Sequence, residues 1–222
     1  MGHLHRRLIA FDLDGTLIDS SRDLAESVNE LLVDLGAAAL PHDTITRMIG
    51  EGAKVLVRRA LAASGVPEDP EAIDRFLEIY DRRLLDHTRP YAGIPDVVRA
   101  ARRYARVAVL TNKPLAPSEK VLAGLGLREL FDDVIGSGGP YPRKPDPTAL
   151  RALMERADAT PEQTLMVGDS RIDYETALNA AARCCLVTYG FNSETFTEIP
   201  TDDVWRVADA AGLADAIARF VD

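Results

Sequence analysis

Two aspartates, Asp12 and Asp14, stand two positions apart directly after a short apolar run. The run at 8–11 is typical of a buried β-strand, and residues two apart on a strand project to the same side. Two carboxylates so close repel each other, so a bound cation or a shared proton must relieve the repulsion. On its own, such a pair is more typical of an acidic turn, since Asp is common in turns. Further metal ligands and a phosphate site elsewhere in the chain must decide between these interpretations.

Polar residues also follow three later apolar runs, each of which is expected to be a strand. The residues that can do chemistry at these three strand ends are Thr111 and Asn112, then Lys144 after a glycine-rich stretch, and then Asp169 and Asp173. Parallel strands of an open sheet end at one edge, where ligands bind in a crevice. The sequence therefore predicts that these side chains converge with the first pair.

The converging side chains suit a metal ion and a phosphate group. Carboxylates of Asp12, Asp14 and Asp169 would form an all-oxygen cluster of the kind that Mg²⁺ prefers. The Thr111 hydroxyl, the adjacent backbone N–H and the Lys144 ammonium are the donors that a tetrahedral dianion requires. A carboxylate beside a bound phosphate can act as a nucleophile, and a second one can move the proton.

Each of these residues also has a purely structural interpretation. Thr111 and Asn112 could form a helix cap, and Lys144 could be a solvated loop residue. Asp169 could cap the following helix, and Asp173 could be an acidic residue of its first turn. Because all of them occur in order at strand ends, a shared site is the favoured interpretation.

The elements that position these residues alternate between strand and helix. Strands are expected at 8–11, 107–110, 134–135, 165–167, 185–187 and, as a possible edge strand, 204–207. Helices are expected between them at 96–103, 117–125, 147–156, 172–182 and 210–220. This alternation predicts an α/β fold with a mostly parallel sheet covered on both faces.

The segment between the first two strands carries only helical periodicity. Helices are expected there at about 20–36, 42–49, 53–64 and 70–87. We therefore expect a core domain formed by 1–19 and 89–222, with an all-helical cap domain, 20–88, inserted after the first strand. Both ends of this insert must return to the crevice, so the cap is expected to lie over Asp12 and Asp14.

Composition limits the classes of partner. The 222 residues carry a net charge of −9 with a pI near 5.0, which argues against non-specific binding to nucleic acid or to an anionic membrane. No apolar run approaches the roughly 20 residues that span a bilayer. Without an apolar region ahead of the first strand, a cytoplasmic location is expected. The neighbouring Cys184 and Cys185 are expected to be buried residues of one strand.

Four motifs resemble those of the haloacid dehalogenase-like superfamily of phosphatases. They read DLDGTLIDS from Asp12, TNK from Thr111, KPDP from Lys144 and GDSRID around Asp169. The resemblance implies a three-layer α/β/α Rossmann-like core with a C1-type helical cap. It also implies Mg²⁺ as the cofactor and a small phosphorylated metabolite as the substrate, in a monomer or homodimer.

The same resemblance implies a role for each motif residue. Asp12 would be the nucleophile that becomes aspartyl-phosphate, and Asp14 the general acid and base, with its backbone carbonyl a metal ligand. Thr111 and Lys144 would hold the phosphate. Asp169 would bind Mg²⁺ directly, and Asp173 would hold a metal-bound water. Dehalogenases of the superfamily lack an acid at the position of Asp14, so dehalogenation is disfavoured.

A narrower resemblance concerns the substrate. Segment 49–61 is similar to the cap segment of phosphoglycolate phosphatases, which makes 2-phosphoglycolate the leading candidate. Among cap cations, Lys54 is favoured over Arg47 and Arg58 as a substrate ligand because it adjoins a glycine turn. The chain departs from that family at Glu51, an acid between two glycines, and the alternatives remain open. They are a pyrophosphatase, a sugar phosphatase, a β-phosphoglucomutase or, more remotely, a non-catalytic binding module.

Overall fold

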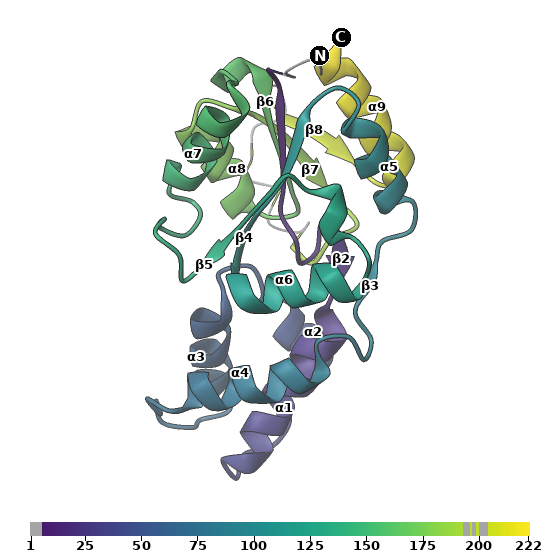
Figure 1. Ribbon diagram of the computed structural model, residues 1–222. Helices are drawn as coiled ribbons and strands as arrows, with labels where there is room; N and C mark the ends of the chain where they lie inside the picture. The colour runs from purple at the N-terminus through teal and green to yellow at the C-terminus, as the bar shows by residue number, and fades with distance from the viewer. Residues whose placement is uncertain (1–5, 193–195, 197–198, 200–203) are drawn as a thin grey trace.

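The structure is a computed structural model, and it describes residues 6–192, 196, 199 and 204–222. These residues form a six-stranded parallel sheet with the strand order β5-β4-β1-β6-β7-β8 (Figure 1). The strand bounds are β1 Leu8–Phe11, β4 Arg106–Pro114, β5 Asp133–Ser137, β6 Thr164–Gly168, β7 Arg183–Val187 and β8 Val204–Val207. The expected α/β fold with a mostly parallel sheet is therefore confirmed.

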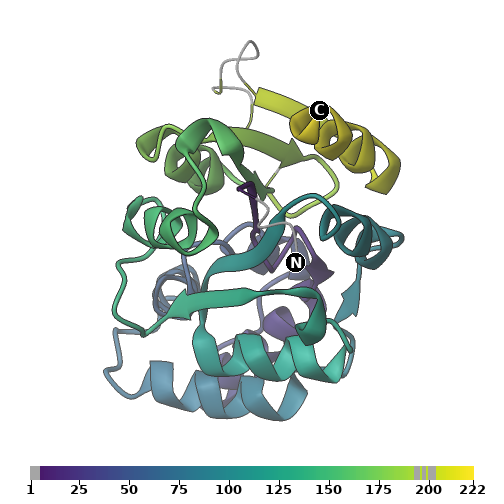
Figure 2. The ribbon, with the colours of Figure 1, turned by 45° about the horizontal axis from the view of Figure 1, so that its top comes forward.

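Helices cover both faces of the sheet, as Figure 1 and Figure 2 show. One face packs against α5 (Ile94–Ala101), α6 (Leu115–Gly124) and α9 (Ala210–Val221), and the other against α7 (Thr148–Ala157) and α8 (Arg171–Asn179). Alternate strand residues supply the two cores. Cys185 lies in the first and Cys184 in the second, so these adjacent cysteines point to opposite faces and both are free.

The strand order reverses beside β1, and this reversal creates the crevice. After β1 the chain goes to β4 and β5 on one side, and it returns to β6, β7 and β8 on the other. Phe11 pairs with Val167 of β6, and the next N–H, of Asp12, donates to the Val167 carbonyl at 2.8 Å. The carboxyl ends of β1 and β6 thus flank the point where ligands bind in open α/β sheets.

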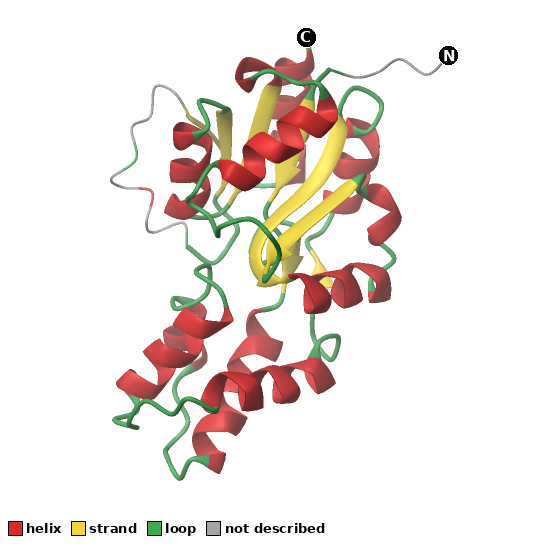
Figure 3. Cartoon of the chain, turned by 60° about the vertical axis from the view of Figure 1, so that its left-hand side comes forward, coloured by secondary structure: helices red, strands yellow, loops and turns green. Residues whose placement is uncertain are grey.

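A helical unit follows β1 and lies beyond the carboxyl edge of the sheet (Figure 1, Figure 3). It consists of α1 Ser21–Asp34, α2 His42–Thr46, α3 Ala53–Ala63 and α4 Ala72–Arg83. The apolar faces of α1 and α4 pack together, and Val28, Leu31 and Phe76 on these faces are fully buried. The helical unit therefore has a packed interior, which is continuous with the core on one face of the sheet.

Two short strands join the helical unit to the sheet. β2 (Ile18–Asp19) and β3 (Arg89–Pro90) pair antiparallel, so the chain leaves and re-enters the core at one place. The buried carboxylate of Asp23 strengthens this junction, because it accepts the N–H groups of His87 and Thr88 at 2.9 and 2.8 Å. The sequence did not predict either strand.

Several element bounds differ from the expected ones. The helix expected at 70–87 ends at Arg83, and the one expected at 42–49 ends at Thr46. The strand expected at 107–110 extends to Pro114, which places Thr111 and Asn112 on the strand itself. None of the helices in the described ranges is long and apolar enough to cross a membrane.

Candidate active site

Asp12 and Asp14 leave the end of β1 in different directions. Asp12 is buried, and its Oδ1 lies 2.9 Å from Lys144 Nζ. The carboxylate of Asp14 instead accepts a hydrogen bond from Ser20 Oγ at 2.6 Å and contacts Lys113 Nζ at 3.0 Å. The two carboxylates therefore have separate cationic or hydroxyl partners, which relieves the electrostatic repulsion expected from their spacing.

Lys144 joins Asp12 to a third carboxylate. Its Nζ lies 2.5 Å from Asp173 Oδ1, and all three side chains are almost completely buried. Burial, only partly offset by Lys144, raises the pKa of Asp12 to about 6. Burial alone would lower the pKa of Lys144, but Asp12 and Asp173 together raise it above its usual range. The lysine is thus held as a cation beside the Asp12 carboxylate.

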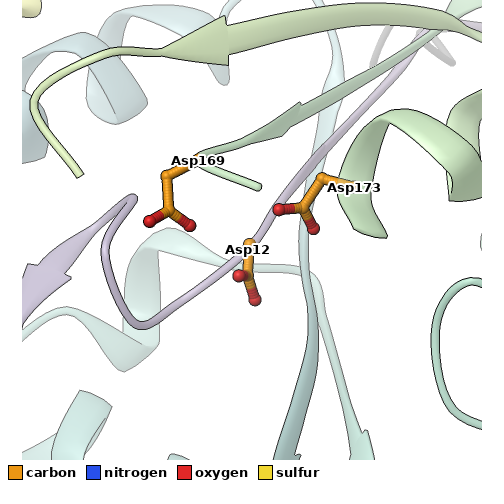
Figure 4. A group of neighbouring side chains, drawn as sticks. All are labelled: Asp12, Asp169 and Asp173. Atoms are coloured by element: carbon orange, nitrogen blue, oxygen red, sulfur yellow. The ribbon is translucent and has the colours of Figure 1, made fainter. Parts of the chain in front are cut away.

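Three carboxylates form a compact acidic group, which Figure 4 shows. One oxygen each from Asp12, Asp169 and Asp173 lies within 4.8 Å of the others, and all three residues are buried. Burial and the neighbouring Asp12 and Asp173 raise the pKa of Asp169 well above its usual value. Buried, mutually repelling oxygen ligands are the donor set that a small divalent cation such as Mg²⁺ satisfies, so the residues fit this metal.

The backbone of the turn after β1 gives Asp169 the room that it needs. Gly15 has φ +85°, and a Cβ at this position would lie 2.2 Å from Asp169 Oδ2. Any side chain here would meet both backbone strain and a clash with the carboxylate. The N–H of Phe191 donates to the same oxygen at 2.7 Å and helps fix its position.

The expected and observed carboxylate groups differ in one member. The sequence led us to expect carboxylates of Asp12, Asp14 and Asp169, whereas the structure groups Asp173 with Asp12 and Asp169. The reason is that the chain changes direction between the two residues. The N–H of Asp12 still continues the pairing with β6, whereas Asp14 forms an isolated bridge with Ile18, so the alternation of a strand no longer directs its side chain. A role for the Asp14 backbone carbonyl as a metal ligand stays a prediction.

Thr111 and Asn112 lie on β4 beside this group, and both are buried. Thr111 Oγ1 accepts the N–H of Lys113 at 3.1 Å. Asn112 Nδ2 donates to the Lys144 carbonyl at 3.1 Å and to the Gly50 carbonyl at 3.2 Å. Asn112 therefore links the loop that contains Lys144 to the turn at Gly50 in the helical unit.

A cavity separates the acidic residues from the helical unit. Asp12 and Asp14 lie on its sheet side with Thr111 and Asn112. Its other wall is largely apolar and consists of Leu24, Ile49, Ala53, Leu56, Phe76 and Leu77. Lys144 lines a neighbouring, larger cavity, so Asp12 and Lys144 meet where the two cavities adjoin.

Residues 9–187 match the model of the family described as haloacid dehalogenase-like hydrolase. The chain belongs to this family. The phosphoglycolate phosphatase 1 of Pseudomonas aeruginosa is 38% identical over 97% of this chain and 82% of its own length. A phosphoglycolate phosphatase of Cereibacter sphaeroides strain ATCC 17029 is 39% identical over 96% of this chain and 98% of its own length. The family and the enzyme class expected from the four motifs are thereby confirmed.

A solved structure agrees with this assignment. The crystal structure of a protein described as a predicted phosphoglycolate phosphatase from Haemophilus somnus 129pt superposes with a TM-score of 0.86 and 30% identity. The match covers 98% of this chain and 99% of that chain. The helical unit is therefore common to this chain and to that structure.

The cap cations considered from the sequence lie away from the inner cavity. Lys54 and Arg58 are exposed on α3 and are not among the residues that line it. Arg47 lines the larger neighbouring cavity, as does Glu51, whose carboxylate is paired with Arg59. Binding of substrate by Lys54 stays a prediction without a contact to support it.

Sequence reasoning assigned no role to Lys113 and Tyr80. Lys113 follows Asn112 on β4, and its Nζ donates to the hydroxyl of Tyr80 from α4. Both residues line the inner cavity, and both are buried. The TNK motif contained the lysine, but no local pattern connects it with a tyrosine of the helical unit.

Proposed function

We propose that this hydrolase is a Mg²⁺-dependent phosphomonoesterase that acts through an aspartyl-phosphate on Asp12, with 2-phosphoglycolate as its substrate. The observation that carries the proposal is the position of the Asp12 carboxylate. It lies between a buried lysine and two further buried acids, at the cavity, while the carboxylate of Asp14 lies apart from it. The names of the relatives support the choice of substrate.

In the first step, an Asp12 oxygen attacks phosphorus as the bond to the ester oxygen breaks. Lys144 and Thr111 offset the negative charge on the phosphoryl oxygens. Asp14 donates a proton to the departing alkoxide, which would otherwise be a poor leaving group. The alcohol is released, and the phosphoryl group remains on Asp12.

In the second step, water attacks phosphorus and Asp14 accepts its proton. The bond to Asp12 breaks, inorganic phosphate leaves, and the Asp12 carboxylate is regenerated. Carboxylates of Asp12 and Asp169, with the Asp14 carbonyl and Asp173 beside them, would hold Mg²⁺, which offsets charge around the phosphoryl group. Residues 20–88 act as the cap domain that excludes bulk water from the reaction.

The apolar wall of the inner cavity favours a small leaving group. Side chains such as Ile49, Leu56 and Phe76 offer no hydrogen bonds to the hydroxyls of a sugar. A sugar phosphate in this cavity would therefore leave several polar groups without partners, at a cost in affinity. This observation favours a two-carbon substrate over a hexose phosphate.

A panel of substrates tests the proposal. The purified protein is assayed with Mg²⁺ for phosphate release from 2-phosphoglycolate, glucose 6-phosphate, β-glucose 1-phosphate and pyrophosphate. We expect the highest kcat/KM with 2-phosphoglycolate. A higher value with another compound would replace the proposed substrate, and a lack of release from every compound would favour a non-catalytic binding module.

A further inference from the structure

Lys113 has an unusual set of neighbours for a lysine at the end of a strand. Its Nζ lies 3.0 and 3.1 Å from the two carboxylate oxygens of Asp14 and donates to the Tyr80 hydroxyl at 2.5 Å. The ammonium also lies 4.5 Å from the centroid of the Tyr80 ring. A residue of the core thus contacts the expected proton donor and a residue of the helical unit at once.

Lys113 is the single cation among the described residues that line the inner cavity. The facing wall is apolar except for Tyr80, and Lys54 and Arg58 occupy solvent-exposed positions elsewhere on α3. An anionic group entering this cavity would lose water, and it must find a charged or polar partner there to bind. Among the polar residues of this cavity, Thr111 is assigned to the phosphate, and Asn112 Nδ2 already donates to two backbone carbonyls. Lys113 and Tyr80 are the remaining side chains that can donate to the anionic group.

We propose that Lys113, held by Tyr80, binds the carboxylate of the substrate and thereby selects phosphorylated small acids. The inference rests on the proposed function, because it names the residue that recognises the glycolate part of 2-phosphoglycolate. Lys113 is then a specificity-determining residue, and it takes the role that the sequence suggested for Lys54.

The lengths of the groups agree with this role. Asp14 must approach the ester oxygen to donate its proton, and Lys113 directly contacts Asp14. In 2-phosphoglycolate a single methylene separates the ester oxygen from the carboxylate. A cation that contacts the proton donor is therefore within reach of that carboxylate.

Tyr80 supplies a second donor. Its oxygen accepts the Lys113 hydrogen bond, so its own proton is directed elsewhere, and no acceptor for that proton is found among the described residues. Burial raises the pKa of Tyr80 to about 12, which keeps the phenol neutral and able to donate. A substrate carboxylate would satisfy both the phenol proton and the ammonium.

Two matched substrates test the inference. 2-Phosphoglycolate and 2-hydroxyethyl phosphate have the same chain, but the second carries an alcohol in place of the carboxylate. We expect Lys113→Met to lower kcat/KM for 2-phosphoglycolate by about 100-fold and that for 2-hydroxyethyl phosphate by much less. The measured quantity is the ratio of kcat/KM for 2-phosphoglycolate to that for 2-hydroxyethyl phosphate. Tyr80→Phe should lower this ratio by about 5-fold. Because each ratio comes from one preparation, it does not depend on the folded fraction.

Lys120→Met is the matched control. Lys120 pairs with Asp81, next to Tyr80 on α4, but it lies outside the cavity, so its loss should leave the ratio unchanged. An equal decrease for both substrates in Lys113→Met would overturn the inference and indicate that Lys113 acts only through Asp14. Loss of the preference in Lys54→Met with its retention in Lys113→Met would also overturn it. If the unaltered enzyme lacks the preference, the proposed substrate fails as well.

Discussion

Lys144 Nζ lies 2.9 Å from Asp12 Oδ1, and both side chains are buried at the carboxyl edge of the sheet. The same ammonium contacts Asp173, so one cation faces two carboxylates in a region that excludes water. With Asp169, three buried carboxylates face this single cation, and functional sites commonly carry such a cost in stability. Stability measurements can therefore test the site independently of turnover.

Removal of the Lys144 charge should destabilise the protein strongly. Lys144→Met leaves Asp12 and Asp173 as buried carboxylates without a cation, and loss of one partner of a buried ion pair costs about 3–5 kcal/mol. Urea unfolding in EDTA measures the free energy of unfolding. Lys120→Met, which breaks an exposed pair, should change it little. Equal stability of the two variants would contradict this charge arrangement.

The pKa of Asp12 predicts how stability depends on pH. Burial raises this pKa from 3.8 to about 6, so the folded protein binds the proton more tightly than the unfolded chain does. Protonation of Asp12 therefore stabilises the folded protein. This contribution is fully present below pH 3.8 and is lost as the pH rises through 6. Metal-free Asp12→Asn should therefore gain stability relative to the unaltered protein as the pH rises from about 4 to about 7. A difference that stays constant over this range would contradict the raised pKa.

Asp169 should control the response to Mg²⁺. Burial raises its pKa, so the carboxylate is costly without a cation, and Asp169→Asn should raise Tm in EDTA. Mg²⁺ at 100 times Kd should stabilise the unaltered protein by about 3 kcal/mol and raise its Tm, because it binds preferentially to the folded state. The variant should lose this response. A thermal shift with Mg²⁺ that is the same in both proteins would exclude Asp169 as a ligand.

Asp14 should matter most for substrates with poor leaving groups. With Asp14→Asn, kcat/KM for 2-phosphoglycolate should fall by about 10²–10⁴-fold, because the alkoxide is no longer protonated. p-Nitrophenolate leaves without a proton, so kcat/KM for p-nitrophenyl phosphate should fall much less. Slow attack by water should then produce a burst of nitrophenolate in rapid-mixing experiments. Equal losses for both esters would argue against proton transfer by Asp14.

The sequence allowed prediction of the sheet and of the residues at its edge. Apolar runs of strand length, each followed by polar residues, marked β1, β4, β5 and β6, and the order of a parallel sheet brings their ends together. Asp12, Lys144 and Asp169 could be placed in one crevice by this topology alone. How deeply these side chains are buried, and which of their charges pair, could not be predicted from the sequence.

Contacts between the helical unit and the core could not be predicted in the same way. The pairing of Lys113 with Tyr80 joins residues whose local patterns carry no information about each other. The choice of Lys54 rested on proximity in sequence to a glycine turn, whereas its side chain is exposed on α3. The direction of the Asp14 carboxylate depended on where β1 ends, and strand ends are poorly defined by apolar runs.

The most direct test of the mechanism is to trap the phosphorylated residue. The enzyme is mixed with 2-phosphoglycolate and Mg²⁺, quenched with acid and reduced with borohydride, which converts an aspartyl-phosphate to homoserine. Mass spectrometry of the peptide that contains β1 should locate the homoserine at position 12, and Asp12→Asn should yield none and release no phosphate. Homoserine at another aspartate, or turnover by Asp12→Asn at the rate of the unaltered enzyme, would contradict the mechanism.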